Sequence, residues 1–203
     1  DIVLTLDAVV AQAGSFAVGP FSATLERGAR VALVGPNGSG KTTLLRAVLE
    51  GEAASGRVSW GTRVAVGLLD QDRSVISGPG PLLEVVAAAL GVTDAAEVRT
   101  LLAKFGLGAE HVMRPCSSLS LGERTRAALA VLQGRAVNVL VLDEPTNHAD
   151  VAAIEQLEDA LAAFGGTVLL VTHDRALLDA VGIDTEWVFT RDDDRATVEV
   201  VGR

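Results

Sequence analysis

The apolar positions of the chain form three short unbroken runs, each shorter than the roughly ten residues of a typical helix. The runs are Val31–Val34, Val139–Leu142 and Val168–Val171. Runs of this length, rich in valine and leucine, are typical of strands buried on both faces of a parallel sheet. Each run is followed by a stretch with helical spacing of apolar residues, at 41–49, 151–164 and 175–181. This alternation of strand and helix predicts a parallel α/β sheet.

Two other regions depart from this pattern. Short alternating or β-rich segments, with turns at Gly14, Gly28, Gly51 and Gly61, occupy Ile2–Val10, Phe21–Leu25, Val58–Trp60 and Val64–Leu69. They predict an antiparallel sheet against one flank of the parallel core. Helical spacing returns at Leu82–Leu90, Val98–Phe105 and Thr125–Leu132, which predicts a helical insertion with Ser77–Pro81 as its hinge.

We therefore predict one domain of the α/β class, built from three parts. The antiparallel β subdomain is expected at residues 1–30 and 56–70, the helical subdomain at 77–135, and the parallel core at 31–50 and 136–190. The acidic run Asp192–Asp194 is expected to be a solvated turn between the last two strands.

Composition narrows the classes of protein. A chain of 203 residues with 49% apolar residues can bury a full core, which excludes a disordered tail and a disulfide-stapled miniprotein. The formal charge of −9 opposes binding of this chain alone to the phosphate backbone of nucleic acids. Cys116 is the one cysteine and cannot form an internal disulfide, so we expect a reducing compartment.

The sequence also bears on location. No window approaches the roughly 18 apolar residues of a membrane-spanning helix, and the N-terminus lacks the order of a signal peptide. We expect a cytoplasmic domain with no direct membrane insertion. The one methionine is Met113 and the chain starts at Asp1, so we expect a processed chain or a piece of a longer protein.

A glycine-rich motif directly follows the first buried run. It reads Gly35, Pro36, Asn37, Gly38, Ser39, Gly40, Lys41 and Thr42, with Thr43 next. The spacing G-x-x-x-x-G-K-T is that of a phosphate-binding loop, in which backbone N–H groups converge on phosphate oxygens. Lys41 is expected to contact the terminal phosphates and Thr42 to offer its hydroxyl to Mg²⁺. A turn that only caps a helix would not require Lys41 followed by Thr42.

Two carboxylates end the second buried run. Asp143 and Glu144 follow Val139–Leu142, at the sheet edge where ligands bind in such folds. We expect Asp143 to belong to the Mg²⁺ shell and Glu144 to orient or deprotonate the attacking water. A strand that merely ends in solvated acids is the alternative, and the neighbouring phosphate loop makes it the weaker one.

Two further polar residues are candidates by position. His173 ends the third buried run at the same sheet edge, where its imidazole could reach the γ-phosphate. Gln71 follows Val64–Leu69 and could contact Mg²⁺ or water through its amide, which would link the nucleotide to the helical insertion. Taken without their positions in the chain, each has a simpler interpretation. A lone histidine is usually structural, and Gln71 would be an ordinary amide at the surface.

These residues in this order resemble an ATP-binding cassette (ABC) ATPase, a P-loop NTPase, over nearly the whole chain. The segment Leu119-Ser-Leu-Gly-Glu-Arg124 is similar to the family signature LSGGQ. Without the family, Ser120 and Glu123 form a capping box for a helix. The resemblance implies that Ser120, Gly122 and Glu123 bind the γ-phosphate of ATP held by a second cassette, so that one cassette alone has half of each site.

Three strings resemble the ABC-F branch of the family. Asp143-Glu-Pro-Thr-Asn-His-Ala-Asp150 is close to DEPTNHLD, with Asp150 in the D-loop position, and both 121–126 and 171–175 are similar to the forms of that branch. ABC-F proteins are soluble, carry two cassettes in one chain and act on ribosomes in translation regulation or antibiotic resistance. Only 47 residues separate Gln71 from Leu119, too few for a ribosome-contacting arm, so the chain resembles a second or excised cassette.

The resemblance therefore implies an Mg·ATP-hydrolysing cassette that pairs with a second cassette of the same parent chain or of a homodimer, with the ribosome contacted through regions outside this chain. An ATPase subunit of a membrane transporter is the first alternative, and a non-hydrolysing regulatory cassette is the second. Leu121 keeps the second open, because it replaces a glycine where backbone would approach phosphate.

The sequence differs from the family pattern at two further places, the position that stacks on the adenine base and the D-loop. The family often stacks adenine on an aromatic residue before the phosphate loop, and Phe16 is the nearest candidate here. A Phe16 buried in the antiparallel sheet is an equally good interpretation, so selectivity for ATP over GTP stays open. Ala149 replaces a leucine of the ABC-F string, which is a milder change.

Overall fold

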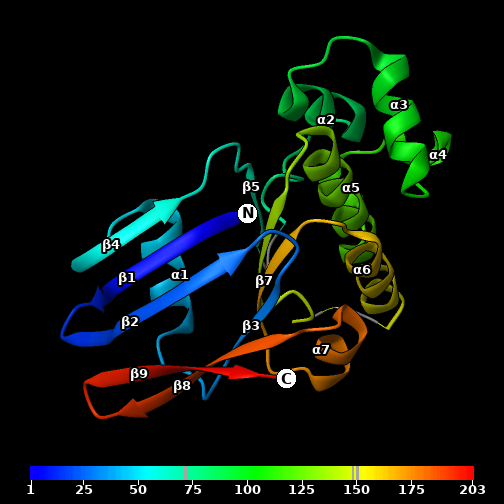
Figure 1. Ribbon diagram of the computed structural model, residues 1–203. Coiled ribbons are helices and arrows are strands. Elements are labelled where there is room, and N and C mark those ends of the chain that lie inside the picture. Colours follow the sequence, from blue (N-terminus) through cyan, green and yellow to red (C-terminus); the bar gives the residue numbers. More distant parts are fainter. Residues whose placement is uncertain (71–72, 148, 150) are drawn as a thin grey trace.

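The computed structural model describes residues 1–70, 73–147, 149 and 151–203. The nine strands found in these residues belong to one sheet, in the spatial order β4-β1-β2-β9-β8-β3-β7-β6-β5. Figure 1 shows the strands β1, β2 and β4 on one side, the helices α6 and α7 on the other, and the helices α2 to α5 projecting as a separate lobe. The strands are β1 (Ile2–Ala13), β2 (Phe16–Glu26), β3 (Arg30–Val34), β4 (Ser55–Trp60), β5 (Val66–Leu69), β6 (Val139–Asp143), β7 (Thr167–Val171), β8 (Thr185–Asp192) and β9 (Arg195–Gly202).

The three apolar runs form the centre of the sheet, as predicted. β3 pairs in parallel with β7 and β8, and β7 pairs in parallel with β6. Successive side chains of a strand point to opposite faces of the sheet, and on these strands the side chains of both faces are buried. On β3, Val31 and Leu33 belong to one core and Ala32 to the other. The unbroken apolar runs in the sequence therefore reflect two cores that share one sheet.

Each core is covered by different helices. Leu44 and Val48 of α1 (Lys41–Glu50) lie in the core that also contains the apolar residues of β1 and β2. The other core is covered by α5 (Leu121–Gly134), α6 (Val151–Ala163) and α7 (Arg175–Val181). Helix α1 thus lies between the antiparallel strands and the parallel core, which holds the phosphate loop at its N-terminus in place.

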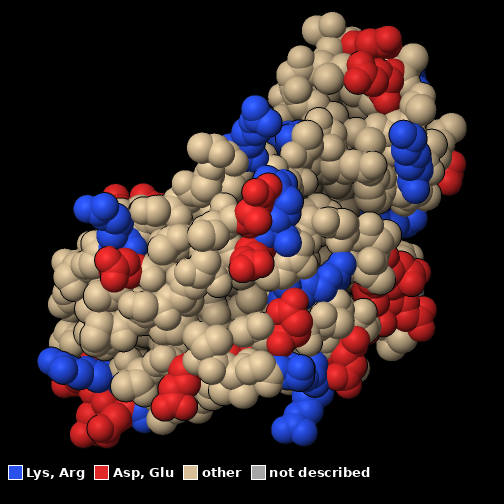
Figure 2. Space-filling view, in the orientation of Figure 1, with Lys and Arg blue, Asp and Glu red and all other residues tan. Residues whose placement is uncertain are grey.

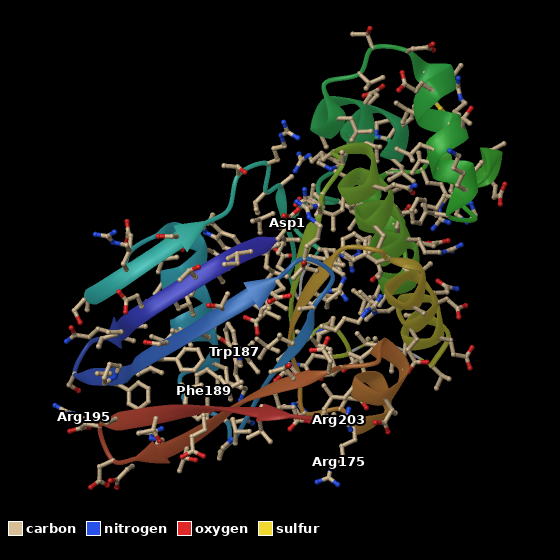
Figure 3. All side chains as sticks on the ribbon, viewed as in Figure 1. Asp1, Arg175, Trp187, Phe189, Arg195 and Arg203 are labelled. Carbon is tan, nitrogen blue, oxygen red and sulfur yellow. The ribbon has the colours of Figure 1, made fainter. Side chains whose placement is uncertain are left out.

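A hairpin joins the antiparallel strands to the parallel core. β8 and β9 pair antiparallel around a turn at Asp193, as the acidic run predicted, and β9 pairs in parallel with β2. Trp187 and Phe189 extend from β8 toward β2 (Figure 3), and the Trp187 ring meets Phe21 edge-on, with ring centres 5.0 Å apart. The antiparallel strands are therefore continuous with the central sheet rather than a separate sheet.

The helical lobe contains α2 (Leu82–Leu90), α3 (Ala95–Lys104), α4 (Ala109–Val112), the short 3-10 turn Cys116–Ser118 and most of α5. The three helices predicted from spacing in this region are present. The helices of the lobe pack against one another through leucine and valine side chains and through Cys116, which is fully buried. The signature segment lies where this lobe meets α6, because a side chain on Gly122 would contact Ala153.

One strand assignment was wrong. Residues 64–69 were predicted as part of the antiparallel sheet, but Val66–Leu69 form β5, which pairs in parallel with β6 at the opposite edge of the sheet. The alternation that misled the prediction is real, because Val66 and Leu68 are exposed and Leu69 is buried. The predicted range 56–70 therefore divides, with β4 in the antiparallel group and β5 in the parallel core.

Arg30 fastens the ends of two helices to the sheet. Its Nη1 donates to the carbonyl oxygens of Leu161 and Val181 at 2.9 and 2.8 Å, and its Nη2 donates to the carbonyl oxygen of Phe164 at 2.7 Å. The last carbonyls of a helix lack partners within the helix, so a guanidinium is well suited to this place. Arg30 therefore stabilises α6 and α7, away from the phosphate loop.

On the face that Figure 2 shows, lysine and arginine side chains are scattered among acidic ones rather than gathered into one basic patch. This distribution agrees with the acidic balance of the whole chain. Within the described residues, no helix combines the length and the apolar character needed to cross a bilayer.

Candidate functional site

The phosphate loop lies between β3 and α1, as its motif predicted. Gly40 precedes the helix at φ +91°, and a side chain there would approach Val18 Cγ2 to 2.2 Å and the Phe16 ring to 2.9 Å. Only glycine combines this backbone conformation with this close packing. The Ser39 side chain is fully buried and its Oγ has no hydrogen-bond partner among the described residues. That hydroxyl is available to a phosphate oxygen.

Lys41 is held at the centre of the loop. Its Nζ donates to the carbonyl oxygens of Gly35 and Pro36, at 2.8 and 3.0 Å, and the residue is only 7% exposed. Burial lowers the pKa of the Lys41 ammonium, an effect that the nearby carboxylates Glu144 and Asp143 oppose. An anionic ligand in the loop would add negative charge beside this buried ammonium and so stabilise its protonated form.

Thr42 and Asp143 converge from two elements. The Thr42 hydroxyl donates to Asp143 Oδ2 across 3.3 Å, which joins the start of α1 to the end of β6. Burial raises the pKa of the Asp143 carboxyl, while the Thr42 hydrogen bond, Arg46 and Lys41 act in the opposite direction. Paired hydroxyl and carboxylate oxygens beside a phosphate site are the ligands that Mg²⁺ prefers. These residues therefore fit the metal that the sequence predicted.

Glu144 and His173 come together at the same sheet edge. His173 Nδ1 lies 3.2 Å from Glu144 Oε1 and 3.1 Å from Oε2. Glu144 has a left-handed backbone at φ +46°, and its N–H donates to the carbonyl oxygen of Val171 across 2.9 Å. The Glu144 carboxylate is mostly buried, while the imidazole is 67% exposed and free to meet a ligand. The predicted acid and histidine thus form one unit.

A hollow of about 300 Å³ lies over the phosphate loop. It is lined by Phe16, Asn37, Gly38, Gly40, Lys41, Thr42, Thr43, Glu144 and Val171. The loop residues and Glu144, which are far apart along the chain, therefore face one common space, as the sequence required. A mixture of loop backbone, one ammonium and one carboxylate is suited to a triphosphate and an attacking water.

Phe16 lies at the rim of this hollow, where its ring touches the loop at Gly40. The Arg191 guanidinium carbon lies 5.0 Å from the ring centre, and Arg191 Nη1 donates to the carbonyl oxygen of Gly38 across 3.0 Å. The contact of Arg191 with the loop was not predicted from the sequence, because Arg191 lies 153 positions from Gly38 along the chain. Stacking of adenine on Phe16 stays a prediction.

The signature segment forms a capped helix start. The Ser120 hydroxyl accepts from the Glu123 N–H at 3.2 Å, and Glu123 Oε2 accepts from the Ser120 N–H at 2.7 Å, which completes the predicted capping box. Glu123 Oε1 lies 3.0 Å from Arg114 Nη1 and 3.2 Å from His111 Nε2. Burial acts to raise the pKa of the Glu123 carboxyl, but the hydrogen bonds from Ser120 and Arg114 and the charges of Arg114 and His111 together lower it.

This network fixes the shape of the segment before any partner arrives. Arg114 and His111 were missed in the sequence, where only the spacing of Ser120 and Glu123 was recognised. The side chain of Glu123 is occupied by its own cassette, so the Ser120 hydroxyl and the helix N-terminus are the groups that the segment presents. None of the residues lining the hollow over the phosphate loop comes from this segment.

Three of the residues named in the sequence are not placed. Gln71, His148 and Asp150 lie outside the described residues. Their assignments as the Q-loop amide and metal ligand, as part of the ABC-F string and as the D-loop acid stay predictions. Ala149 is described, and its N–H donates to the carbonyl oxygen of Thr146 across 3.1 Å.

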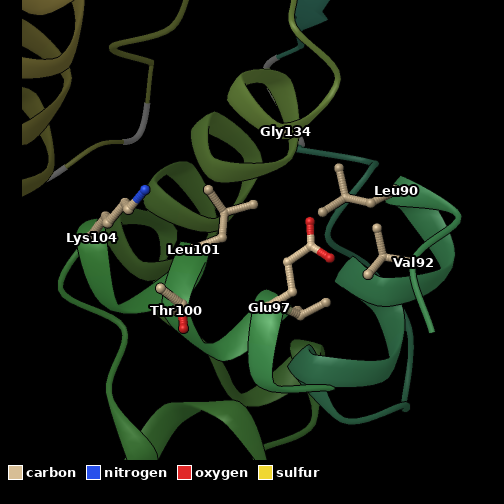
Figure 4. A pocket seen from close by; sticks show the side chains of 8 residues that line it. Leu90, Val92, Glu97, Thr100, Leu101, Lys104 and Gly134 are labelled. Atoms are coloured by element: carbon tan, nitrogen blue, oxygen red, sulfur yellow. The ribbon is translucent and has the colours of Figure 1, made fainter. Parts of the chain in front are cut away.

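A second hollow, of about 290 Å³, lies in the helical lobe among α2, α3 and α5. Figure 4 shows Leu90, Val92 and Leu101 around it, with the Glu97 side chain reaching between them. It shares no lining residue with the hollow over the phosphate loop. The convergent polar groups of the predicted chemistry lie at the phosphate loop.

The half-buried Asp143 carboxyl is expected to affect the stability of the chain. Because its folded-state pKa is raised, the folded chain holds this proton more tightly than the unfolded chain, and stability is lost as pH rises from about 3.9 through the raised value. Asp143→Asn removes the ionised carboxyl, so we expect the nucleotide-free chain to melt at a higher temperature near pH 7. This gain should shrink as pH falls toward the ordinary aspartate pKa.

Melting curves from pH 4 to 8 measure this effect, with Asp159→Asn, an exposed carboxylate on α6, as the matched control that changes little. With ATP and Mg²⁺ present the order should reverse, because Asp143→Asn loses a metal ligand. A nucleotide-free Asp143→Asn chain that melts below the unmodified chain at pH 7 would contradict the assignment.

Comparisons with known proteins show which proteins this chain is similar to. The family model described as ABC transporter matches residues 18–147. Sequence relatives include the putative ATP-binding protein YdiF of Bacillus subtilis, 40% identical over 77% of the chain, and the ATP-binding protein Uup of Escherichia coli, 39% identical over 87%. The ribosome protection protein VmlR of Bacillus subtilis is 39% identical over 77%. The chain spans 25 to 28% of the length of these relatives.

Solved structures show the same fold. The cbiO1 structure from Clostridium perfringens, described as part of the ABC transporter complex cbiONQ, covers the whole chain with a TM-score of 0.79 at 21% identity. The match spans 89% of that chain. A bacterial Atm1-family ABC exporter with ATP bound covers 99% of this chain and 39% of its own, with a TM-score of 0.76 at 22% identity. At these identities the likeness concerns the fold alone.

Proposed function

The chain belongs to the ABC transporter family of ATP-binding domains and is therefore an ATP-hydrolysing enzyme, and on that premise we propose that it works as one cassette of a pair that closes on Mg·ATP. The observation that carries the proposal is the division of the chemistry between two places. The hollow over the phosphate loop contains Lys41 and Glu144, while the capped signature at Ser120 contributes nothing to it. A second cassette that offers its own signature would complete the site.

The binding step uses the phosphate loop. Lys41 Nζ, which donates to two loop carbonyls, is placed to donate to the β- and γ-phosphate oxygens. The N–H groups at the start of α1 face the same anion, and the partial positive charge of the helix terminus favours it. Thr42 and Asp143 would hold Mg²⁺, which supplies neutralisation of charge on the phosphates.

The chemical step uses the pair of Glu144 and His173. Glu144 orients a water whose oxygen forms a bond to the γ-phosphorus while the bond to the β–γ bridging oxygen breaks, and the water proton passes to the carboxylate. His173 fixes the carboxylate through Nδ1, which leaves its exposed Nε2 edge for a γ-phosphate oxygen. Because the carboxylate is buried and fixed before ATP arrives, little rearrangement is needed in the closed state.

The setting we propose is the ribosome, as part of an ABC-F-type soluble protein in translation or antibiotic resistance. The support is the ABC-F character of residues 143–150 together with the relative VmlR, a ribosome protection protein. The chain spans about a quarter of that relative, so contacts with RNA would come from other regions of a longer protein. The charge of −9 on this chain agrees with such a division.

The test is fractionation of cells that express a tagged protein containing this chain. We expect co-sedimentation with ribosomes that increases when a non-hydrolysable ATP analogue is added, and that falls with Lys41→Ala. Stable recovery in the membrane fraction, with none on ribosomes, would favour an ATPase subunit of a transporter instead. Release of phosphate by the same protein would exclude a non-hydrolysing regulatory cassette. Leu121 in the signature is the residue that suggests this alternative.

A further inference from the structure

Arg73 is a fully buried arginine that the proposed chemistry does not use. It is 1% exposed, follows β5 and has a left-handed backbone at φ +53°. A buried guanidinium is costly unless its donors find acceptors. The donors of Arg73 reach acceptors on three separate segments of the chain, so its position is set by all three at once.

Three of the hydrogen bonds of Arg73 come from different nitrogens of its guanidinium. Nε donates to the Thr125 hydroxyl at 3.0 Å, and Nη2 donates to the carbonyl oxygen of Pro145 at 2.7 Å. Nη1 donates to the carbonyl oxygen of Asp70 at the end of β5. Because a guanidinium is planar and rigid, its donors cannot move independently, and a shift of one acceptor is transmitted to the others.

Two of these hydrogen bonds continue, as two branches, to functional segments. The Thr125 hydroxyl donates to the carbonyl oxygen of Leu121 across 2.9 Å, and Leu121 is the first residue of α5, next to Ser120. On the other branch, Pro145 directly follows Glu144, whose backbone is left-handed and therefore needs support from its surroundings. A continuous line of hydrogen bonds thus joins Leu121 of the signature segment to the carbonyl oxygen of Pro145, the residue after Glu144.

We propose that Arg73 is a positioning residue that couples the two ATP sites of a pair. This inference rests on the proposed function, because in a pair the Glu144 of one cassette acts on its own ATP while its signature serves the ATP of the other. Arg73 links these two places within one cassette. Displacement of the signature by the partner's γ-phosphate is transmitted through Thr125 and Arg73 to the backbone that carries Glu144.

The experiment mixes two forms of the chain and follows phosphate release. A reporter chain with intact Glu144 is mixed with a large excess of a donor chain that carries Glu144→Gln. Each reporter is then paired with a donor, and the measured turnover comes from the reporter's own Glu144 and the donor's signature. Single substitutions are placed in the reporter or in the donor, and kcat and KM for ATP are measured separately.

Arg73→Met should lower kcat from either chain, by about tenfold, the scale of effect that a small misplacement of catalytic groups produces. In the reporter it displaces Glu144, and in the donor it displaces the signature. KM should stay within about twofold, because Lys41 and the phosphate loop are untouched. A residue that only stabilised the fold would not separate kcat from KM in this way.

Thr125→Val gives the sharper result because Thr125 lies on the signature branch alone. In the donor it should lower kcat severalfold through the signature that the donor presents. In the reporter it should also lower kcat severalfold, because it breaks the line from the reporter's own signature to its Glu144. The matched control is Arg30→Met, which removes an arginine that donates to three carbonyl oxygens elsewhere in the fold and should lower the melting temperature but not kcat.

Two results would overturn the inference. One is a donor Arg73→Met that leaves reporter kcat unchanged, and the other is a reporter Thr125→Val that leaves kcat unchanged. If Arg73→Met fails to fold, the two arms with Thr125→Val decide alone. If the unmodified mixture itself shows no turnover, the pairing is wrong and both proposals fall, whereas turnover that ignores all these substitutions removes only the role of Arg73.

Discussion

Glu144→Gln is expected to lower ATP hydrolysis by about 10²- to 10⁴-fold, the range that a positioned general base contributes. The amide has nearly the same shape but cannot accept the water proton, and the geometry of the phosphate loop is unaffected. ATP binding should therefore persist, and the closed pair should accumulate because hydrolysis no longer resets it. Phosphate release and solution mass with ATP and Mg²⁺ measure the two effects.

The matched control is Glu155→Gln, an exposed carboxylate on α6 that should leave both readouts unchanged. Normal turnover by Glu144→Gln would contradict the assignment of Glu144 as the group that orients the attacking water and accepts its proton. Loss of ATP binding together with turnover would instead assign Glu144 to the binding step.

Lys41→Ala is expected to weaken ATP binding by about a hundredfold, which corresponds to the loss of one to two strong charge-assisted hydrogen bonds. The loop itself should survive, since its shape depends on glycines and on the start of α1. Burial lowers the pKa of the Lys41 ammonium, so its removal relieves a desolvation cost, and the nucleotide-free chain should not lose much stability. Titration with a fluorescent ATP analogue measures the affinity.

Lys104→Ala is the control for that titration, because Lys104 is exposed on α3 in the helical lobe. Its affinity for the analogue should equal that of the unmodified chain. Retention of tight binding by Lys41→Ala would place the triphosphate somewhere other than the hollow over the phosphate loop.

The parts of the site that the sequence predicted depend on local chemistry. The loop from Gly35 to Thr42 binds phosphate through its own backbone, so its motif contains most of the information about its shape. The carboxylates and His173 were placed correctly because parallel strands end at one edge, which brings the residues after β6 and β7 together. The same rule explains why Glu144 and His173 meet although 29 positions separate them.

The parts that escaped prediction depend on packing between distant segments. β5 alternates because it is an edge strand with one exposed face, and such alternation is also typical of an antiparallel strand. Arg73 and Arg191 gave no signal, because each acquires its role from acceptors on segments that only the folded chain brings near. The network around Glu123 was half visible, since the capping box is local whereas His111 and Arg114 lie on another turn of the lobe.

We propose that Lys41, Asp143 and Glu144 act on one ATP, at a site that a second cassette must complete. Phosphate release per chain, measured over a wide range of chain concentration with saturating Mg·ATP, tests it most directly. We expect turnover per chain to be feeble when the chain is monomeric by mass and to rise with concentration as pairs form. Turnover per chain that is fast and constant, in a chain whose mass stays monomeric throughout, would contradict the claim.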